Sequence, residues 1–367
     1  MRHFCKQLVF VLIVLFAVQS LSANEPVSNK NEEPEQKEGQ KVEKFNPGEF
    51  IFEHIGDGYS WHILKFRDFE LAIPLPVILH SSHSGWHLFM SSKFHHGHSS
   101  YLGFEIAKEG SNKGLIVEKL ENGTFETPFD ISISKNVLAL LISMTLLLWI
   151  FLSIAKNYKQ KPNSAPSGMQ SLFEPIILFV RDDIARPSIG EHKYEKYTPY
   201  LLTVFFFILF NNLLGLLPIF PGGANLTGNI AITMVLALCS FIITTFSAKK
   251  QYWIHMVNTP GVPWWLKLPI PLIPIIEIMG MFIKPFVLMV RLFANMLAGH
   301  IIALGFFSLI FIFGAMNVYA GFSISVFSIA FAIFMMMVEL LVAFIQAYVF
   351  TLLSAIYFGM AMEEEHH

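Results

Sequence analysis

The chain has 367 residues, of which 54% are hydrophobic and 14% are charged, and its mean hydropathy is +0.54. This composition excludes an ordinary soluble protein and predicts a membrane protein with several spans. The net charge of −2 and the lack of a basic aromatic cluster argue against a nucleic-acid partner. Cys5 and Cys239 are the only cysteines, so we expect neither a disulfide framework nor a thiolate metal site.

The N-terminal end has the pattern of a secretory signal peptide over residues 1–23. Arg2 and Lys6 precede an apolar run at 8–18, and small residues follow it. An uncleaved anchor is the alternative interpretation. Residues 24–44 are almost all polar, which predicts a disordered N-terminal segment, the polar lead.

Residues 45–130 mix short apolar and polar runs, which predicts a small extramembrane region with a few strands. With the lead it forms an extension over residues 24–135. Imidazoles are good ligands for zinc or copper, and the region is rich in them. No helical or strand spacing brings three together, so we expect a solvated loop and no metal site; the closely spaced histidines are His80, His83, His87, His95, His96 and His98.

Three shorter spans are expected at about residues 136–155, 200–217 and 230–247. Basic residues follow the first span, which places that end in the cytoplasm and agrees with an N-terminal segment outside it. The second and third spans form a hairpin whose turn lies outside. Amides near this turn either line a water path or cap helix ends; this polar group is Asn211, Asn212, Asn225, Thr227 and Asn229.

Two further apolar stretches, at about 275–313 and 323–358, are too long for one perpendicular crossing of about 20 residues. We expect a steeply tilted antiparallel hairpin with its turn at 314–321. The fold class is therefore an all-α integral membrane protein with about five spanning helices, plus the small N-terminal region. The membrane domain covers residues 136–367, and its C-terminus is expected in the cytoplasm.

A polar stripe interrupts the first long helix. Glu277, Lys284 and Arg291 recur every seven residues, about 20° apart around a helix, and Asn295 follows one turn later. His300 lies about half a turn away from Arg291. An arginine at the centre of a membrane helix costs about 2.5–3.5 kcal/mol on insertion scales, so such residues are functional by default.

The last helix carries a second stripe, with Glu339 and Gln346 seven residues apart and Tyr357 eleven further on. If the two long helices pair antiparallel, His300 and Glu339 lie at similar distances from the turn and can interact directly. A carboxylate beside an imidazole can relay protons, since both groups can titrate near working pH. A merely structural hydrogen-bonded pair is the alternative.

These residues carry a resemblance to a known family. The run Arg291-Leu-Phe-Ala-Asn295-Met-Leu-Ala-Gly299-His300 and the run from Glu339 to Gln346 resemble motifs of the a subunit of F-type ATP synthases. The Lys284-Pro285 pair and the run from Asn211 to Pro218 are similar too, so the resemblance covers about 136 to the C-terminus. The sequence departs from the family pattern in two respects. Many bacterial members carry a glutamate where this chain has His300 and a histidine where it has Glu339. Ala294 stands where many of them have a glycine.

The resemblance implies a proton-translocating stator subunit that faces a c-ring in the inner membrane of a bacterium. It implies that Arg291 faces the ring carboxylate and separates two half-channels. Asn295, His300, Glu339 and Gln346 would line the outer half-channel, and Glu277 the inner one. Implied partners are the c-ring, peripheral-stalk b subunits and membrane lipid, with no cofactor.

No P-loop motif occurs in the chain, so we expect it to translocate ions and not to phosphorylate. The alternative function is a stand-alone ion or solute transporter that uses Arg291 as an anion site. Against it, the sequence has no matching halves with broken helices at corresponding positions. A purely structural scaffold leaves Arg291 unexplained.

Overall fold

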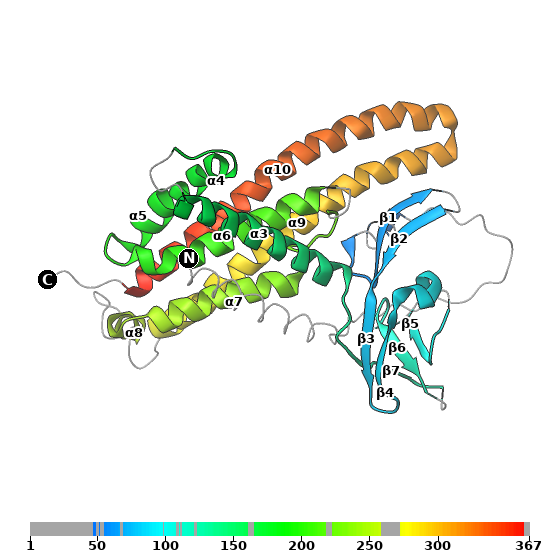
Figure 1. The fold of residues 1–367 in the computed structure, drawn as a ribbon, viewed down its shortest axis with the longest axis horizontal. Helices are drawn as coiled ribbons and strands as arrows, with labels where there is room; N and C mark the ends of the chain where they lie inside the picture. The colour runs from blue at the N-terminus through cyan, green and yellow to red at the C-terminus, as the bar shows by residue number, and fades with distance from the viewer. Residues whose placement is uncertain are drawn as a thin grey trace.

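A computed structural model describes residues 47–48, 51, 55–66, 69–97, 99–107, 110, 112–120, 123–160, 165–217, 222–257 and 272–362. The expected signal peptide and polar lead lie outside these residues. The described chain has two parts, a helical part that begins at Lys135 and a small β region before it (Figure 1).

Three helices form the bundle at the centre of the helical part: α3 (Lys135–Gln160), α6 (Tyr194–Leu216) and α7 (Ile230–Ser247). Helix α6 lies at the middle, because its side chains are apolar all round and pack against α3 and α10. Phe205, Phe206 and Phe207 are all buried there. The three spans expected in this part are confirmed, with α6 beginning six residues earlier than expected.

The two long helices are α9 (Leu272–Met316) and α10 (Val318–Met362), each of 45 residues. At 1.5 Å per residue each is about 68 Å long, more than twice the hydrocarbon thickness of about 30 Å. They pack along each other as a hairpin that extends beyond the ends of α6 and α7 (Figure 1). The expected pair of long C-terminal helices is therefore confirmed.

The turn of the hairpin is a single non-helical residue, Asn317. Its side-chain Oδ1 accepts a hydrogen bond from the backbone N–H of Tyr319 (3.0 Å), which satisfies a free donor at the start of α10. Gly321 lies directly against Gly314, where a side chain would collide with the other helix. The close approach of the two backbones here depends on Gly321, since a Cβ added to Gly314 would meet no atom within 4 Å.

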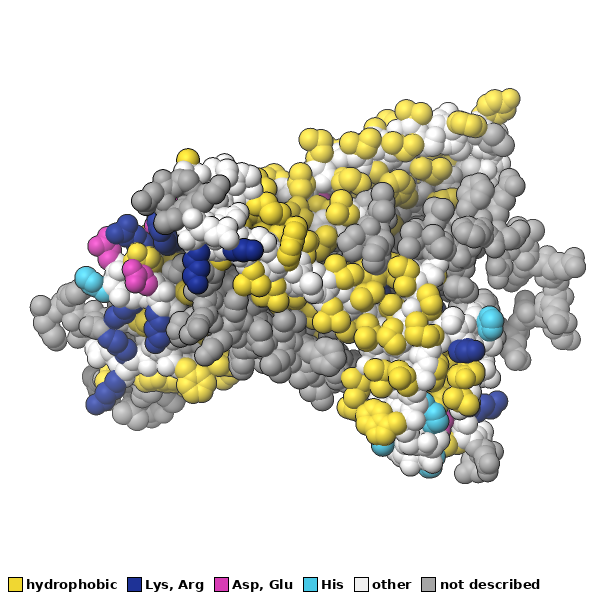
Figure 2. All heavy atoms as spheres, viewed as in Figure 1, with side chains coloured by type: hydrophobic (Ala, Val, Ile, Leu, Met, Phe, Trp, Pro, Cys, Tyr) yellow, Lys and Arg dark blue, Asp and Glu magenta, His cyan; other side chains and the backbone are white. Residues whose placement is uncertain are grey.

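Short helices gather at the opposite end of the bundle: α4 (Met169–Leu178), η2 (Phe179–Ala185), α5 (Arg186–Ile189) and α8 (Lys250–Val257). The η2 segment is a π-helical turn that continues α4. The end of α10 is fixed against α5, because Gly359 contacts the Ser188 carbonyl so closely that no side chain fits. Lysine and arginine side chains gather at this end (Figure 2).

The small β region has three antiparallel sheets, with orders β1-β2, β4-β3-β8 and β5-β6-β7. A 3-10 turn, η1 (Ser91–Gly97), follows β4. The strands are β1 (Ser60–Phe66), β2 (Phe69–Pro74), β3 (Pro76–Ser81), β4 (Gly85–Met90), β5 (Phe104–Ile106), β6 (Ile116–Lys119), β7 (Phe125–Glu126) and β8 (Phe129–Asp130).

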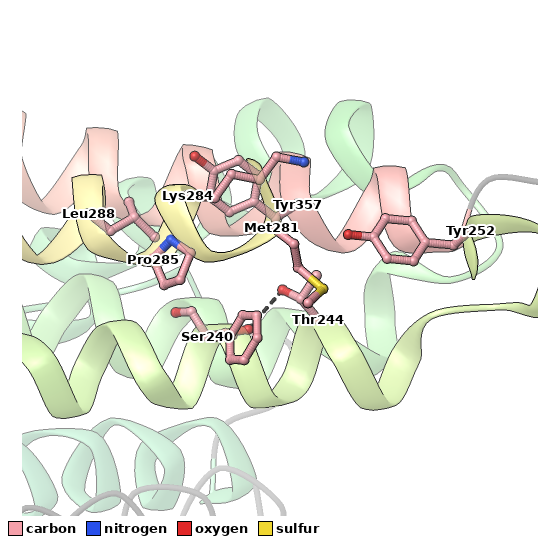
Figure 3. Close-up of a pocket in the computed structure, with 9 residues that line it drawn as sticks. Ser240, Thr244, Tyr252, Met281, Lys284, Pro285, Leu288 and Tyr357 are labelled. Atoms are coloured by element: carbon pink, nitrogen blue, oxygen red, sulfur yellow. Dashed lines mark hydrogen bonds between the residues drawn. The ribbon is translucent and has the colours of Figure 1, made fainter. Parts of the chain in front are cut away.

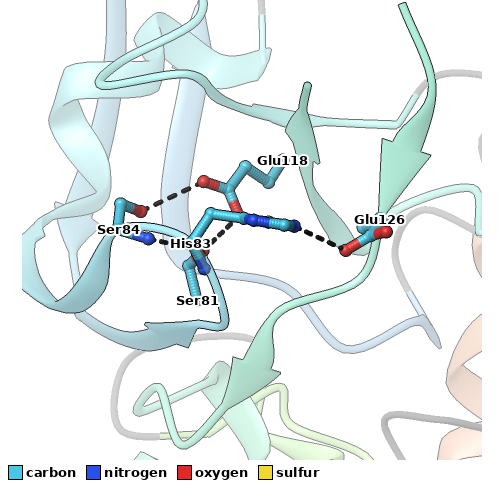
Figure 4. Close-up of polar contacts among 5 residues, drawn as sticks. All are labelled: Ser81, His83, Ser84, Glu118 and Glu126. Atoms are coloured by element: carbon cyan, nitrogen blue, oxygen red, sulfur yellow. Dashed lines mark hydrogen bonds and ion pairs between the residues drawn. The ribbon is translucent and has the colours of Figure 1, made fainter. Parts of the chain in front are cut away.

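The second and third sheets enclose their own apolar core, which includes Val77, Leu79, Phe89 and Phe104. Beside it Glu118 is buried and accepts hydrogen bonds from the hydroxyls of Ser81 and Ser84 (Figure 4). Both oxygens of this buried carboxylate are therefore satisfied, which is what burial of a charge requires.

The histidines of this region are separated. His80 packs edge-on against Trp86, and the His87 ring is 2.8 Å from the Ser84 hydroxyl. His83 lies 3.4 Å from Glu126 (Figure 4). Within the part of the chain that the structure describes, no three metal-ligating side chains converge. His98 lies outside the described residues.

Within the described residues, five helices are long and apolar enough to cross a membrane. They are α3, α6, α7 and the greater part of α9 and α10. The expected fold class, a mostly helical membrane protein with two long C-terminal helices, is confirmed.

Candidate functional site

Arg291 lies near the middle of α9 and is exposed. Asn295, one turn further on, is exposed as well. Arg291 forms no ion pair or hydrogen bond with any residue that the structure describes. A guanidinium stays charged at all accessible pH values and is costly to leave without a counter-charge in an apolar setting. The counter-charge for Arg291 is thus expected from outside the chain.

The surface around Arg291 is apolar. Phe286, Val287 and Val290 on α9 are exposed, as are Leu341 and Phe344 on α10. The two long helices are the least buried spans of the chain. An apolar surface that carries one fixed positive charge suits a partner with an apolar face and a carboxylate.

Glu339 lies on α10, across the interhelical contact from α9, and is 9% exposed. Its carboxylate is packed directly against Gly299 of α9, where an added Cβ would overlap the carboxylate oxygen. Its Oε1 has no hydrogen-bond partner in the described protein. Sequence reasoning missed Gly299, although its place beside His300 in the motif was a signal. A side chain at position 299 would displace the carboxylate of Glu339 from its observed position.

His300 is half-buried and contacts two elements. Its Nδ1 lies 3.1 Å from the carbonyl oxygen of Met296, one turn back on α9. Its Nε2 faces α6, where a Cβ added to Gly215 would lie 3.8 Å away. Lys135, the first residue of α3, is within electrostatic range of the ring.

The expected direct contact between His300 and Glu339 is not made. The two residues share one level of the hairpin, because Glu339 covers Gly299 and His300 follows it. His300, however, turns toward its own helix and α6, while Glu339 reaches across to α9 at Gly299. The predicted level of the two residues along the hairpin is correct, but the predicted direction of the imidazole ring is wrong.

Gln346, two turns beyond Glu339, is buried in the bundle. The nearby polar side chains near the α6–α7 turn differ in how fully they are paired. Asn229 caps α7 by accepting from the N–H of Ala231 (2.9 Å), and Asn212 accepts from the Thr227 hydroxyl (2.6 Å). The remaining two keep polar atoms without a partner among the described residues; they are Asn211 Oδ1 and Asn225 Nδ2.

Glu277 lies near the other end of α9 and is exposed. Tyr252 of α8 faces it: partial burial, and then the negative charge of Glu277, raise the pKa of Tyr252 above its usual value. The phenol is therefore neutral at physiological pH and can donate or accept a hydrogen bond.

A small cavity of about 20 Å³ lies between Glu277 and Arg291, large enough for a single water molecule. Its polar lining comes from α7, α8, α9 and α10 (Figure 3). The Lys284 ammonium lies 5.5 Å from the ring centre of Tyr357, and Tyr357 is also within electrostatic range of Arg291. The polar residues that line it are Ser240, Thr244, Tyr252, Lys284 and Tyr357.

Comparison with known proteins now decides the family. The family described as ATP synthase A chain matches residues 137–359, from α3 almost to the end of α10. The chain belongs to the ATP synthase subunit a family. ATP synthase subunit a of Chloroherpeton thalassium is 43% identical over 246 residues, which are 65% of this chain and 69% of the relative.

Other members of the subunit a family agree. ATP synthase subunit a 2 of Chlorobaculum tepidum is 43% identical over 287 residues, covering 72% of this chain and 78% of the relative. ATP synthase subunit a of Myxococcus xanthus is 42% identical over 257 residues, covering 67% and 78%. The chain is accordingly a multi-pass bacterial membrane protein of ATP synthesis and proton transport.

The family match contains every candidate site residue. The small β region is covered by a separate match, to Domain of unknown function (DUF8433), at residues 50–136. The boundary between the two matches falls at the first residues of α3.

Proposed function

We propose that this chain is the proton-translocating stator subunit of a rotary F-type ATP synthase. Two half-channels reach the c-ring from opposite sides of the membrane, and Arg291 separates them. The outer half-channel uses Asn295, His300, Glu339 and Gln346, and the inner one uses Glu277. The chain works in a complex with the c-ring and peripheral-stalk b subunits.

The observation that carries this proposal is the exposed Arg291 on an apolar surface, without a counter-charge in the described chain. A ring carboxylate that arrives opposite Arg291 is stabilised in its ionised form, so its pKa falls and it releases its proton. The guanidinium itself gives up no proton, so protons cannot pass straight from one half-channel to the other. One residue thereby performs both the release and the separation.

The outer half-channel is supported by buried polar atoms without partners. Glu339 Oε1, Asn211 Oδ1 and Asn225 Nδ2 have no hydrogen-bond partner in the described protein. Buried polar groups are normally paired with protein or water, so these atoms are suited to water molecules along a path. His300 lies beside them with Nε2 turned toward α6.

The inner half-channel is supported by the cavity between Glu277 and Arg291 (Figure 3). Tyr252, which is within electrostatic range of Glu277, lines it, as does Leu288, one turn before Arg291. Lysine and arginine side chains gather at this end of the molecule (Figure 2). From the positive-inside tendency we infer that this end, with the C-terminus, faces the cytoplasm and that the β region lies outside.

The first prediction tests Arg291. Arg291→Ala is expected to abolish proton-driven ATP synthesis in proteoliposomes, because both proton release and the barrier depend on the guanidinium. Arg291→Lys keeps a positive charge of different geometry and is the matched control for charge alone. Blue-native electrophoresis checks that each variant assembles. Synthesis at the normal rate by Arg291→Ala would refute the proposal.

Isolation of the chain separates this function from a stand-alone transporter. We expect it to copurify with a ring of small hairpin subunits that carry a membrane carboxylate. A chain that purifies alone and accumulates an anionic solute in vesicles would support the transporter instead.

A further inference from the structure

The sheet β4-β3-β8 has two apolar faces. One face, with Val77, Leu79 and Phe89, is buried in the core of the β region. On the other, Trp86 is 64% exposed and Leu88 is 74% exposed. An antiparallel sheet with one face in water usually alternates apolar and polar residues, and β4 does not. Its outer face is therefore shaped for contact with something other than water.

The apolar outer surface extends across all three strands. The register places Trp86 beside His80 and Leu88 beside Ile78, and His80 pairs in turn with Phe129 on β8. No Asp, Glu, Lys or Arg side chain belongs to this face of the three described strands. We call it the apolar sheet face; it consists of Ile78, His80, Trp86, Leu88, Met90 and Phe129.

This face is held close to the beginning of a membrane span. The backbone N–H groups of Ile131 and Ile133 donate to carbonyls of β3, and the N–H of Lys135 donates to the Gly58 carbonyl. Asp57 adds hydrogen bonds from the Ser134 hydroxyl (2.7 Å) and the Asn136 N–H (3.0 Å). The sheet and the first turn of α3 are thus joined by an ordered chain segment.

The lengths of α3 and of the connecting segment are compatible with contact between this face and the membrane surface. Helix α3 has 26 residues and is about 39 Å long, about 9 Å more than the hydrocarbon core. Phe129 precedes Lys135 by six residues, so it lies within about 20 Å of the start of α3. The short connection therefore allows the apolar sheet face to reach the headgroup zone.

The face also continues the lipid-exposed surface of α3. Leu141, Trp149 and Leu152 are exposed on α3, and hydrophobic side chains run from the helices onto the β region in one view (Figure 2). Tryptophan is enriched where a protein meets the boundary between headgroups and acyl chains. Lysine and arginine side chains gather at the opposite end of the molecule, and a few also lie on the β region (Figure 2).

We propose that the apolar sheet face docks on the lipid bilayer, at the boundary between headgroups and acyl chains. The β region thereby anchors the start of α3 to the membrane surface. This inference concerns the β region and the bilayer, and it holds or fails independently of proton translocation.

The test uses the full chain in its complex, in nanodiscs of phosphatidylcholine with and without nitroxide-labelled phosphatidylcholine. Cys5 and Cys239 are replaced by serine, and Leu88→Cys carries an environment-sensitive fluorophore. The matched control is Leu102→Cys, because Leu102 is 59% exposed and lies in the turn before β5, away from the sheet β4-β3-β8.

We expect nitroxide lipid to quench the label at position 88 several-fold more than the label at position 102. We expect aqueous iodide to quench the label at position 88 several-fold less than the label at position 102. Equal iodide quenching at both positions would overturn the proposal. A label at 88 that neither quencher reaches would also overturn it, because a protein partner would then cover the face. Met90→Cys repeats the measurement two residues along β4, in case the label at 88 disturbs folding.

Discussion

The two carboxylates of the proposed proton paths, Glu339 on α10 and Glu277 on α9, are held differently. Toward the hairpin turn, Glu339 is buried against Gly299, and one of its oxygens has no partner in the described protein. Toward α8, Glu277 is exposed and faces Tyr252. Both carboxylates are assigned to a proton path, but only Glu339 depends on exact packing.

This difference suggests that protons move in a different way at each of the two carboxylates. A buried carboxylate without a protein partner needs ordered water or another titrating group, so small displacements should matter. An exposed carboxylate is hydrated already, so its replacement should be tolerated better. The predictions below test this contrast, from the largest expected effect to the smallest.

The largest effect is expected from neutralising each carboxylate in a separate variant and comparing the two losses of activity. Glu339→Gln should lower proton-driven ATP synthesis by about 10²-fold or more, the usual contribution of a positioned acid or base. Glu277→Gln should lower it by less than about tenfold, since water at the exposed site can still carry protons. The measurement is the rate of synthesis in proteoliposomes under one imposed pH gradient. Equal losses would remove the distinction between the two ends.

A smaller effect is expected from adding one methyl group. Gly299→Ala forces the Glu339 carboxylate aside, because the added Cβ would overlap the end of this flexible side chain. We expect synthesis to fall severalfold while the complex still assembles. Gly280→Ala is the matched control, because no atom lies within 4 Å of its added Cβ. Unchanged synthesis by Gly299→Ala would mean that the position of Glu339 is not critical.

The smallest effect is expected at Lys284. Lys284→Met removes the ammonium above the Tyr357 ring but keeps an apolar side chain of similar length. Loss of this cation–π contact should destabilise the helical part by about 0.5–1 kcal/mol. A slightly lower thermal midpoint of the purified complex checks this, with Lys284→Arg as the control that retains the cation. A strong loss of synthesis at unchanged stability would instead place the ammonium in the inner path.

The helices were predictable because their signals are local. Apolar runs of sufficient length predict spans whatever the rest of the chain does, and α7 begins and ends where the sequence indicated. The seven-residue spacing likewise placed Glu277, Lys284 and Arg291 on one stripe. The direction of His300 was not predictable, because it depends on Gly215 of another helix.

The sequence by itself determined the membrane class, the long C-terminal hairpin and the polar stripes, since apolar length and helical period are properties of contiguous residues. Only the tertiary structure decided that Gly299 makes room for Glu339 and that a cavity joins four helices near Lys284. It also decided that one sheet of the β region leaves an apolar face open. Each of these depends on the distance between atoms far apart in the chain, which packing alone sets.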